Sequence, residues 1–286
     1  MNKNTIWAIL LIGIILIAFS LYNSKVAKQQ QREQSVRDSI ARQEAMEAIR
    51  HEKANDSVPI PQAADTRTGT YSNAYLNRSL EGTESLHVLE NNKLRITFTN
   101  KGGQPYSVQI KNFKTYQGDS LIFFNGPSNK LMLDLYAGEQ INTDDFFFIP
   151  NNVTEGNLIT FSLYFDKGSY IEYVYTLEED SHLLNLSINL VGMDRFIPRN
   201  VTQLDLDWTV DIRHLEKGFN NEKNYSTIAY KYPNTKDVEK LGLRKPNAGE
   251  SLKTRVEWVA FQQQFFSAII IADDSFNSGD ISFRFY

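Results

Sequence analysis

Residues 159–177 read ITFSLYFDKGSYIEYVYTL, and this stretch decides the fold. Every second residue is apolar, both before and after the turn-forming run Asp166-Lys167-Gly168-Ser169. A period of two is typical of a strand with one buried face, because successive side chains point to opposite faces of a sheet. The stretch therefore predicts a β-hairpin whose turn lies at residues 166–169.

The same period recurs along most of the chain after residue 86. The alternating apolar positions are Leu94, Ile96 and Phe98, then Val108 and Ile110 after a turn at Asn100–Gly103, then Leu131, Leu133 and Leu135, then Leu184, Leu186, Ile188 and Leu190, and then Leu204, Leu206, Trp208, Val210 and Ile212. In the last run each apolar residue is flanked by Gln203, Asp205, Asp207, Thr209 or Asp211, which predicts one buried and one wet face. Strands this numerous, separated by turns and not by helices, predict an all-β fold of large antiparallel sheets packed face to face.

Two polar stretches interrupt this pattern, Glu216–Ser226 and Thr235–Leu252. Both are expected to be long connections between strands. Loops of this length in a compact domain are either functional or disordered, and the residues alone leave both readings open.

The N-terminus has a different character. Residues 6–22 carry no charge and are apolar apart from Gly13 and Ser20, with Trp7 and Tyr22 near the two ends, which predicts a transmembrane helix. The alternative is a signal peptide cleaved after Ala18-Phe19-Ser20. The uncleaved helix fits better because the apolar run continues past the cleavage point.

The orientation of this helix is ambiguous from charge alone. Lys25, Lys28, Arg32 and Arg37 outnumber Lys3, which by itself favours a cytoplasmic C-terminal side. Long domains, however, cross the membrane largely regardless of flanking charge.

Two segments separate the membrane helix from the strands. Residues 23–54 are rich in Gln, Arg and Glu, and the pairs Glu33–Arg37 and Asp38–Arg42 have the i,i+4 spacing that supports a solvated helical stalk. A coiled coil is less well supported because apolar residues do not recur every three or four positions. Residues 55–85 are polar and aperiodic, which predicts a linker to a domain at 86–286.

Composition excludes several classes of function. The 286 residues carry a net charge of -4, and residues 54–286 hold 22 Lys and Arg against 29 Asp and Glu. Nucleic acid is therefore not expected as a partner. The chain has no cysteine, which excludes disulfides, thiol catalysis and cysteine-based zinc sites.

Candidate chemical residues are few. His51 falls in the stalk and His87 at the domain edge, while His182 and His214 are the two that could face a cleft. Asp144-Asp145 are adjacent and need not converge on a strand, and the acidic wet face of one strand accounts for Asp205, Asp207 and Asp211 better than a cation site does. We therefore assign no catalytic, cofactor-binding or metal-binding residue, expect no enzyme activity and no cofactor, and leave the substrate-binding residues unknown.

Aromatic residues make up 12% of the chain, with 14 Tyr and 18 Phe. They could line a groove for sugars or for apolar segments. Because most of these rings fall at inward positions of the alternating strands, a bulky sandwich core is the preferred interpretation.

Two motifs give the chain a family resemblance. Residues 257–269 read EWVAFQQQFFSAI and residues 94–103 read LRITFTNKGG. Together with Asn2-Lys3-Asn4-Thr5, the membrane helix and the charged stalk, they make the whole chain resemble the N-terminal part of the YidC/Oxa/Alb family of membrane protein insertases. The closest type is the bacterial one with a large periplasmic domain, as in Bacteroidetes.

This resemblance implies a location and a fold. Residues 1–5 are expected in the cytoplasm, residues 6–22 in the bacterial inner membrane, and residues 23–286 in the periplasm. The domain is expected to be a β-supersandwich with a topology similar to galactose mutarotase. The family's insertase core of further transmembrane helices is absent from this sequence, so the chain is expected to be truncated.

The resemblance also implies a function in the insertion, folding or complex formation of integral inner-membrane proteins, with or without the Sec translocon. The implied partners are nascent membrane proteins, Sec translocon components and the lipid bilayer around residues 6–22. Two alternatives stay open: a membrane-anchored carbohydrate-binding or mutarotase-like protein, and an anchored scaffold that acts only through protein contacts. A mutarotase-like enzyme would need a His and a carboxylate within hydrogen-bond reach in a cleft.

Overall fold

The computed structural model describes residues 71–152, 156–241 and 247–284. All of them belong to one compact unit that runs from Ala63 to Tyr286. The predicted transmembrane helix (residues 6–22), the stalk (23–54) and the first part of the linker (55–70) lie outside the described residues. Within the described ranges, no helix combines the length and the apolar character that crossing a membrane requires.

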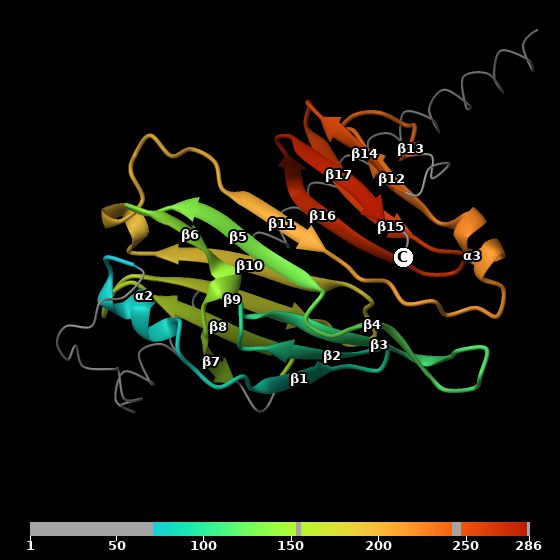
Figure 1. The fold of residues 1–286 in the computed structure, drawn as a ribbon, viewed down its shortest axis with the longest axis horizontal. Coiled ribbons are helices and arrows are strands. Elements are labelled where there is room, and N and C mark those ends of the chain that lie inside the picture. The colour runs from blue at the N-terminus through green and yellow to red at the C-terminus, as the bar shows by residue number, and fades with distance from the viewer. Residues whose placement is uncertain (1–70, 153–155, 242–246, 285–286) are drawn as a thin grey trace, which may run out of the picture. The chain divides into compact units, whose positions relative to one another are not determined.

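Antiparallel strands dominate the described unit, as the period of two predicts (Figure 1). One sheet has the order β1-β2-β3-β4 and a second has the order β10-β9-β8-β7. Their strands are β1 (Leu86–Glu90), β2 (Leu94–Thr99), β3 (Gln104–Lys114), β4 (Ser120–Asn125), β7 (Ile149–Asn152), β8 (Leu158–Tyr164), β9 (Tyr170–Leu177) and β10 (Leu184–Val191).

The two sheets share one apolar core that is built largely from aromatic rings. In it the rings of Phe98 on β2 and Tyr175 on β9 lie 4.6 Å apart. The core also holds these almost fully buried rings: Phe146, Phe148, Phe161, Phe165 and Tyr173. The prediction that most of the aromatic residues fill a core holds only in part, because ten Phe and Tyr side chains are buried among the described residues while others, such as Tyr116 and Phe265, are exposed.

Residues 159–177 form the predicted hairpin. Strand β8 pairs with β9 from Leu158 opposite Thr176 to Tyr164 opposite Tyr170. In the turn, the Asp166 carboxylate accepts a hydrogen bond of 2.7 Å from the backbone N–H of Gly168. This bond is the main reason that the pKa of the Asp166 carboxyl lies below its ordinary value.

The turn after β2 fastens separate parts of the chain to one another. The Asn100 side chain accepts a hydrogen bond of 2.7 Å from the N–H of Ser85, and the Asn100 carbonyl accepts one of 2.8 Å from Phe148. The N–H of Gly102 donates to the carbonyl of Phe146 at 2.8 Å. The turn thus joins the start of β1 to the segment that leads into β7.

The next two residues extend this junction to β9 and β5. Gly103 has a φ of +62°, and a Cβ at this position would lie 3.0 Å from the Cβ of Phe161, so the site favours glycine. Its buried carbonyl accepts a hydrogen bond of 2.9 Å from the Tyr175 hydroxyl. The buried Gln104 side chain accepts a bond of 2.5 Å from the N–H of Leu131. One turn therefore positions the hairpin and the start of β5.

A third sheet has the order β11-β5-β6. Its strands are β5 (Lys130–Tyr136), β6 (Gln140–Asn142) and β11 (Asp205–Thr209). The sequence predicts a longer strand at residues 203–212, and this length is wrong. After Thr209 the backbone turns to other partners, because the N–H of Asp211 donates to the Asn129 side chain at 2.8 Å and that of Arg213 donates to the carbonyl of Phe123 at 3.4 Å.

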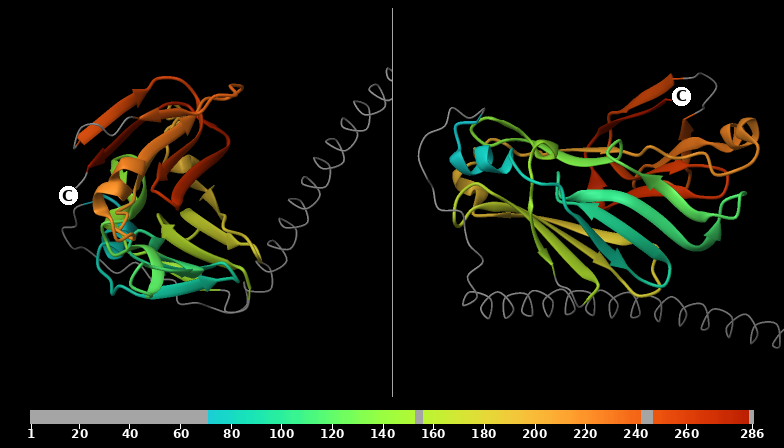
Figure 2. Two further views of the ribbon diagram at one scale, coloured as in Figure 1. Left: turned by 90° about the vertical axis from the view of Figure 1, so that its right-hand side faces the viewer. Right: turned by 60° about the horizontal axis from the view of Figure 1, so that its bottom comes forward.

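The last strands form two more sheets with a core of their own. One has the order β13-β12-β15-β16 and the other pairs β14 with β17. Their strands are β12 (Thr227–Lys231), β13 (Glu239–Leu241), β14 (Asn247–Leu252), β15 (Val256–Gln262), β16 (Ser267–Phe276) and β17 (Gly279–Arg284). Figures 1 and 2 show these strands gathered on one side of the unit, with β11 running between them and the first two sheets.

The two stretches expected to be long connections contain regular structure, which corrects that expectation. Helix α3 (Phe219–Tyr225) lies inside residues 216–226, where the buried side chain of Glu222 accepts a hydrogen bond of 3.2 Å from the N–H of Leu215. Strands β13 and β14 lie inside residues 235–252, where each finds an antiparallel partner. Pairing with β12 and β17 stabilises β13 and β14, although the local sequence of these two strands shows no strand period.

The predicted linker at residues 55–85 also needs correction in its last part. Helix α2 (Ala74–Ser79) begins after Asn73, whose side chain accepts from the backbone N–H of Tyr75 and Leu76 and so caps the helix. Leu76 is 1% exposed and belongs to the core of the first two sheets. The folded domain therefore starts before residue 86.

Two short 3-10 helices complete the described elements. The first, η1 (Thr143–Asp145), precedes β7, and the second, η2 (Met193–Arg195), follows β10.

Replacing Tyr175 by Phe tests the junction at Gly103. The change removes the hydroxyl that donates to the buried carbonyl of Gly103 and is expected to lower the free energy of unfolding by about 1–3 kcal/mol. Denaturant titration of the full chain in detergent measures this loss. The matched control is Tyr136→Phe at an exposed ring, for which a change within about 0.5 kcal/mol is expected. Equal effects of the two substitutions would contradict the role of the hydroxyl.

Like charges face one another where β5 pairs with β11. Asp134 on β5 lies directly opposite Asp205 on β11. Asp207 is two residues after Asp205 on β11. Burial raises the pKa of the Asp134 carboxyl, and the charges of Asp207 and Asp205 raise it further. The ionised form of Asp134 is therefore less favourable in the folded chain than in the unfolded one.

Replacing Asp134 by Asn should stabilise the fold at pH 7 by about 0.2–1 kcal/mol, because it removes charge repulsion across the strand pair. The repulsion exists only above the raised pKa, so the gain should shrink as the pH falls and vanish once the native carboxyl is protonated. Thermal unfolding at several pH values measures the change in stability of the Asp134→Asn variant. The control is Asp237→Asn, at an exposed loop aspartate. A loss of stability at pH 7 would show that Asp134 makes a favourable contact instead.

Candidate functional site

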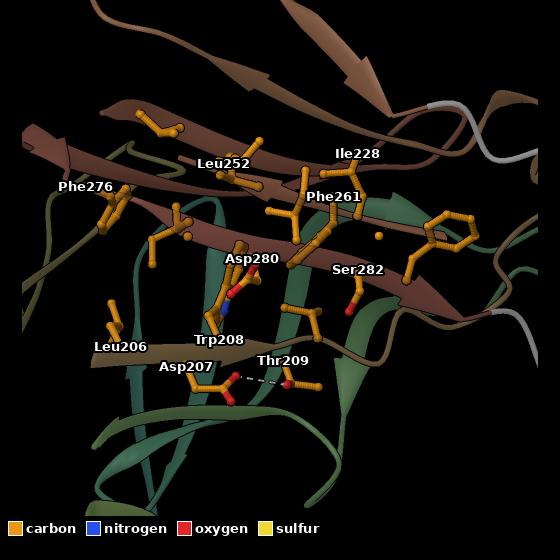
Figure 3. A pocket seen from close by; sticks show the side chains of 18 of the residues that line it. Leu206, Asp207, Trp208, Thr209, Ile228, Leu252, Phe261, Phe276, Asp280 and Ser282 are labelled. Carbon is orange, nitrogen blue, oxygen red and sulfur yellow. Dashed lines mark hydrogen bonds between the residues drawn. The ribbon is translucent and has the colours of Figure 1, made fainter. Parts of the chain in front are cut away.

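A large cleft lies between β11 and the C-terminal strands (Figure 3). Its volume is about 2000 Å³. One wall comes from β11 and the residues after it, and the opposite wall comes from β12 and from β14 to β17. The cleft thus joins segments as far apart in the sequence as β11 and β17.

Both walls of the cleft contribute apolar side chains among their polar ones. The first wall contributes Leu206, Trp208, Val210 and Ile212, and the second contributes Ile228, Leu252, Val256, Val259, Phe261, Ile270, Phe276, Ile281 and Phe283. In Figure 3 the Trp208 side chain rises from β11 toward the strand that carries Asp280 and Ser282, and Phe261 points down to meet it. The rings of Trp208 and Phe261 lie 4.9 Å apart.

These apolar residues come from the alternating run that the sequence predicts to have one buried face. Leu206 and Trp208 are only partly buried, and Leu204 is 36% exposed. The prediction of a fully buried face is therefore wrong for this strand. Its apolar side chains line the cleft, and Leu206 also packs against the core of the first two sheets.

The charged residues that line the cleft are predominantly acidic. Five are aspartates and two are basic: Asp134, Asp205, Asp207, Asp211 and Asp280 against Lys253 and Arg284. Three of the aspartates have hydroxyl partners, because Ser128 donates to Asp211 at 2.9 Å, Ser251 donates to Asp280, and Thr209 donates to Asp207. The site thus combines apolar walls with a negative rim.

Two strands that border the cleft lie at the ends of their sheets. Strand β11 pairs only with β5, and β16 pairs only with β15 among the described strands. Each therefore has one backbone edge without a strand partner in this part of the chain, which is the kind of edge to which an extended segment can add.

The wet face predicted for residues 203–212 is confirmed, since Asp205, Asp207 and Asp211 are all exposed. They do not converge on a cation, and no group of three or more His, Asp or Glu side chains in the described ranges could hold a metal ion. Asp207 instead accepts a weak hydrogen bond of 3.5 Å from Thr209 on its own strand.

The described histidines belong to different parts of the chain. His51 falls outside the described residues. His87 on β1 lies 2.9 Å from the Ser85 hydroxyl, and burial lowers the pKa of its imidazole. His182 is exposed just before β10. Only His214 lines the cleft.

His214 meets the geometric condition set for the mutarotase-like alternative, because its Nδ1 contacts Oε2 of Glu222. The arrangement, however, is that of a structural pair. The Glu222 side chain is only 5% exposed, and its other oxygen accepts from the N–H of Leu215. The pair therefore fastens α3 to the segment after β11 and leaves no free carboxylate oxygen facing the cleft.

The adjacent carboxylates Asp144 and Asp145 take separate roles in η1. Asp144 accepts a hydrogen bond of 2.7 Å from the Gln104 amide and forms an ion pair with Lys130. Asp145 raises the pKa of the Tyr71 phenol by its charge, after the larger effect of burial. As expected, the two do not converge on a common site.

The sequence reasoning missed the second wall of the cleft. Phe261 belongs to the stretch that carries the family resemblance, but its place opposite Trp208 depends on strand pairing far from it in sequence. The spacing of Val256, Val259 and Phe261 within β15 is irregular and gives no sign of a cleft.

Comparisons with known proteins agree on the family. Residues 87–285 match the model of the YidC periplasmic domain. The chain is 33% identical over 283 residues to a membrane protein insertase YidC of Phocaeicola vulgatus, which covers 99% of this chain and 44% of that protein. It is 32% identical over 278 residues to the YidC of Bacteroides fragilis, covering 96% of this chain and 44% of the relative.

A more distant relative gives the same picture. The membrane protein insertase YidC of Porphyromonas gingivalis is 26% identical over 286 residues, covering 99% of this chain and 45% of the relative. The chain thus spans less than half the length of the curated relatives it matches. The expectation that the chain is not an enzyme agrees with the names of these relatives. With its domain model matched from residue 87 to residue 285, the chain belongs to the YidC family of membrane protein insertases.

Proposed function

We propose that this chain is the membrane-anchored periplasmic part of an insertase that serves the insertion, folding or complex formation of integral inner-membrane proteins. Family membership supports this, as do relatives more than twice as long that are named as insertases. Nascent membrane proteins, Sec translocon components and the bilayer around residues 6–22 are the partners, and the acidic domain does not bind nucleic acid.

The topology proposed for the chain follows the family. Residues 1–5 lie in the cytoplasm, 6–22 cross the inner membrane, 23–54 form a helical stalk, and the sheets lie in the periplasm as a β-supersandwich of mutarotase-like topology. The antiparallel sheets around a shared core support the last point. The charges at Lys25, Lys28 and Arg32 oppose this orientation, but a domain of this length is exempt from the charge rule.

The cleft is the part of the domain that holds substrate, and its apolar walls are the observation that carries this proposal. A volume of about 2000 Å³ exceeds the roughly 300–1,000 Å³ typical of small-molecule pockets. A polypeptide segment fills such a space better than a single sugar does. Apolar side chains of the segment would bury against Trp208 and Phe261, which removes their surface from water.

The rim and the strand edges define the segment more narrowly. Five aspartates around the cleft favour a segment that carries basic residues beside its apolar part. The free edges of β11 and β16 favour an extended backbone over a helix, because only an extended chain can donate and accept along a strand edge. The proposed ligand is an extended apolar segment flanked by Lys or Arg.

Calorimetric titration of the full chain in detergent with two soluble peptides tests this assignment. Both peptides share one apolar segment, flanked by lysines in one and by aspartates in the other. The lysine peptide should bind more tightly, and Trp208→Ala should weaken its binding roughly ten-fold, since loss of a central aromatic costs about 1–2 kcal/mol. Tyr136→Ala, at an exposed ring outside the cleft, should leave the affinity unchanged.

Equal binding of the two peptides, or equal affinity of the Trp208→Ala variant, would contradict the proposed role of the cleft. The carbohydrate-binding alternative predicts a different result in the same instrument. There, a saccharide such as galactose would release heat on binding, and Trp208→Ala would abolish that heat while the peptides gave none.

A further inference from the structure

Exposed aromatic rings are concentrated at one end of the domain. Within the described residues six Phe or Tyr side chains are exposed, and Tyr136 is the one that lies elsewhere. The other five define what we call the aromatic tip: Phe113 (50% exposed), Tyr116 (52%), Phe219 (47%), Tyr225 (60%) and Phe265 (66%).

Three parts of the chain carry the tip, and contacts between side chains hold them together. They are the turn between β3 and β4, helix α3, and the turn between β15 and β16. The rings of Phe113 and Phe266 meet edge to face at 5.3 Å. This contact joins the end of β3 to the turn between β15 and β16. Asn221 on α3 donates to the Gln264 side chain at 3.3 Å. Figures 1 and 2 show α3 and the β3–β4 turn at the same end of the unit.

The base of the tip is a packed cluster, which makes the exposed rings a fixed surface. Leu121, Phe123, Phe124 and Leu215 are buried there, and the partly buried Phe266 packs against them. The rings of Phe123 and Phe266 lie 6.3 Å apart. The exposed rings therefore project from a firm base.

The charge of the tip differs from that of the rest of the domain. Its exposed cations are Lys114, Arg213 and Lys217, against the carboxylates of Asp119 and the half-buried Glu216. Residues 54–286 as a whole are acidic, with 22 basic against 29 acidic residues. The tip thus carries more cations than carboxylates in a domain that is acidic as a whole.

We infer that the aromatic tip rests on the surface of the lipid bilayer. Tyr rings can lie in the headgroup region, where an apolar ring with a polar edge is favoured, and Phe rings can bury at the boundary between headgroups and acyl chains. Lys and Arg beside them attract anionic headgroups. A protein partner of matching shape fits less well, because the five rings stand on three separate projections and not in a groove.

The position of the tip also bears on the cleft. Phe219 of the tip and the neighbouring Gln263 line the cleft as well. Contact of the tip with the bilayer therefore brings one end of the cleft to the membrane surface. This consequence rests on the proposed function of the cleft, whereas the contact itself rests on the exposed rings and cations of the tip.

The absence of cysteine allows a direct test with single labels on the full chain. Gln117→Cys places a fluorescent label in the β3–β4 turn. Tyr136→Cys places the control label at the last residue of β5, whose arrowhead lies at the end of the unit away from α3 (Figure 1). The chain is reconstituted in vesicles of phosphatidylethanolamine and phosphatidylglycerol, and the label is quenched either by iodide in water or by a spin-labelled lipid.

The label at Gln117 should be quenched several-fold more by the spin-labelled lipid than the label at Tyr136, and less by iodide. Replacing Tyr116, Tyr225 and Phe265 together by Ser should reduce lipid quenching at Gln117 to the level of the control. Leu183 and Leu190 are exposed but do not belong to the tip. Replacing both by Ser should leave lipid quenching at Gln117 unchanged.

Equal quenching at the two positions would overturn the inference. So would a Gln117 label shielded from both quenchers, since that pattern means that protein covers the tip. Flotation of the vesicles separates this inference from the proposed anchor. A triple-Ser variant that still floats supports the anchor at residues 6–22, whereas flotation that depends on the three rings supports the tip and contradicts the anchor.

Discussion

The turn from Asn100 to Gln104 is the constraint on which the rest of the domain depends. Its backbone and side chains bind the start of β1, the segment before β7, the Tyr175 hydroxyl on β9 and the N–H of Leu131 on β5. Unpaired polar groups in a buried place are costly, so every one of these bonds fixes a partner. The motif at residues 94–103, one of the two that carry the family resemblance, thus ends in a structural junction. This junction holds β5, the strand with which β11 pairs.

The same junction sets the electrostatics of the cleft. Strand β5 carries Asp134 opposite Asp205, so the pairing that positions β11 also assembles like charges at the rim of the cleft. A negative rim around apolar walls costs stability in the empty domain. Binding of an apolar segment with basic residues would offset this repulsion. The stability of the sheet is therefore linked to the proposed ligand.

The sequence predicts those parts of the fold in which local pattern and tertiary structure agree. The hairpin at residues 159–177 has alternation on both strands and turn residues between them, and it forms as expected. Helix α3 was missed because its residues show no apolar period, and it is held by the buried Glu222. Strand β11 is shorter than predicted because Asn129 and Phe123 take the next backbone N–H groups. The cleft was not predictable, since Trp208 and Phe261 meet only through pairings with other strands.

The central claim is that the cleft contacts membrane proteins during their insertion, and photocrosslinking in living cells tests it most directly. A photoreactive phenylalanine analogue is placed at Phe261 in the gene for the whole protein, with Tyr136 as the control position. The account predicts crosslinks from position 261 to newly made membrane proteins and none from position 136. Absence of crosslinks at 261, or equal crosslinks at both positions, would contradict it.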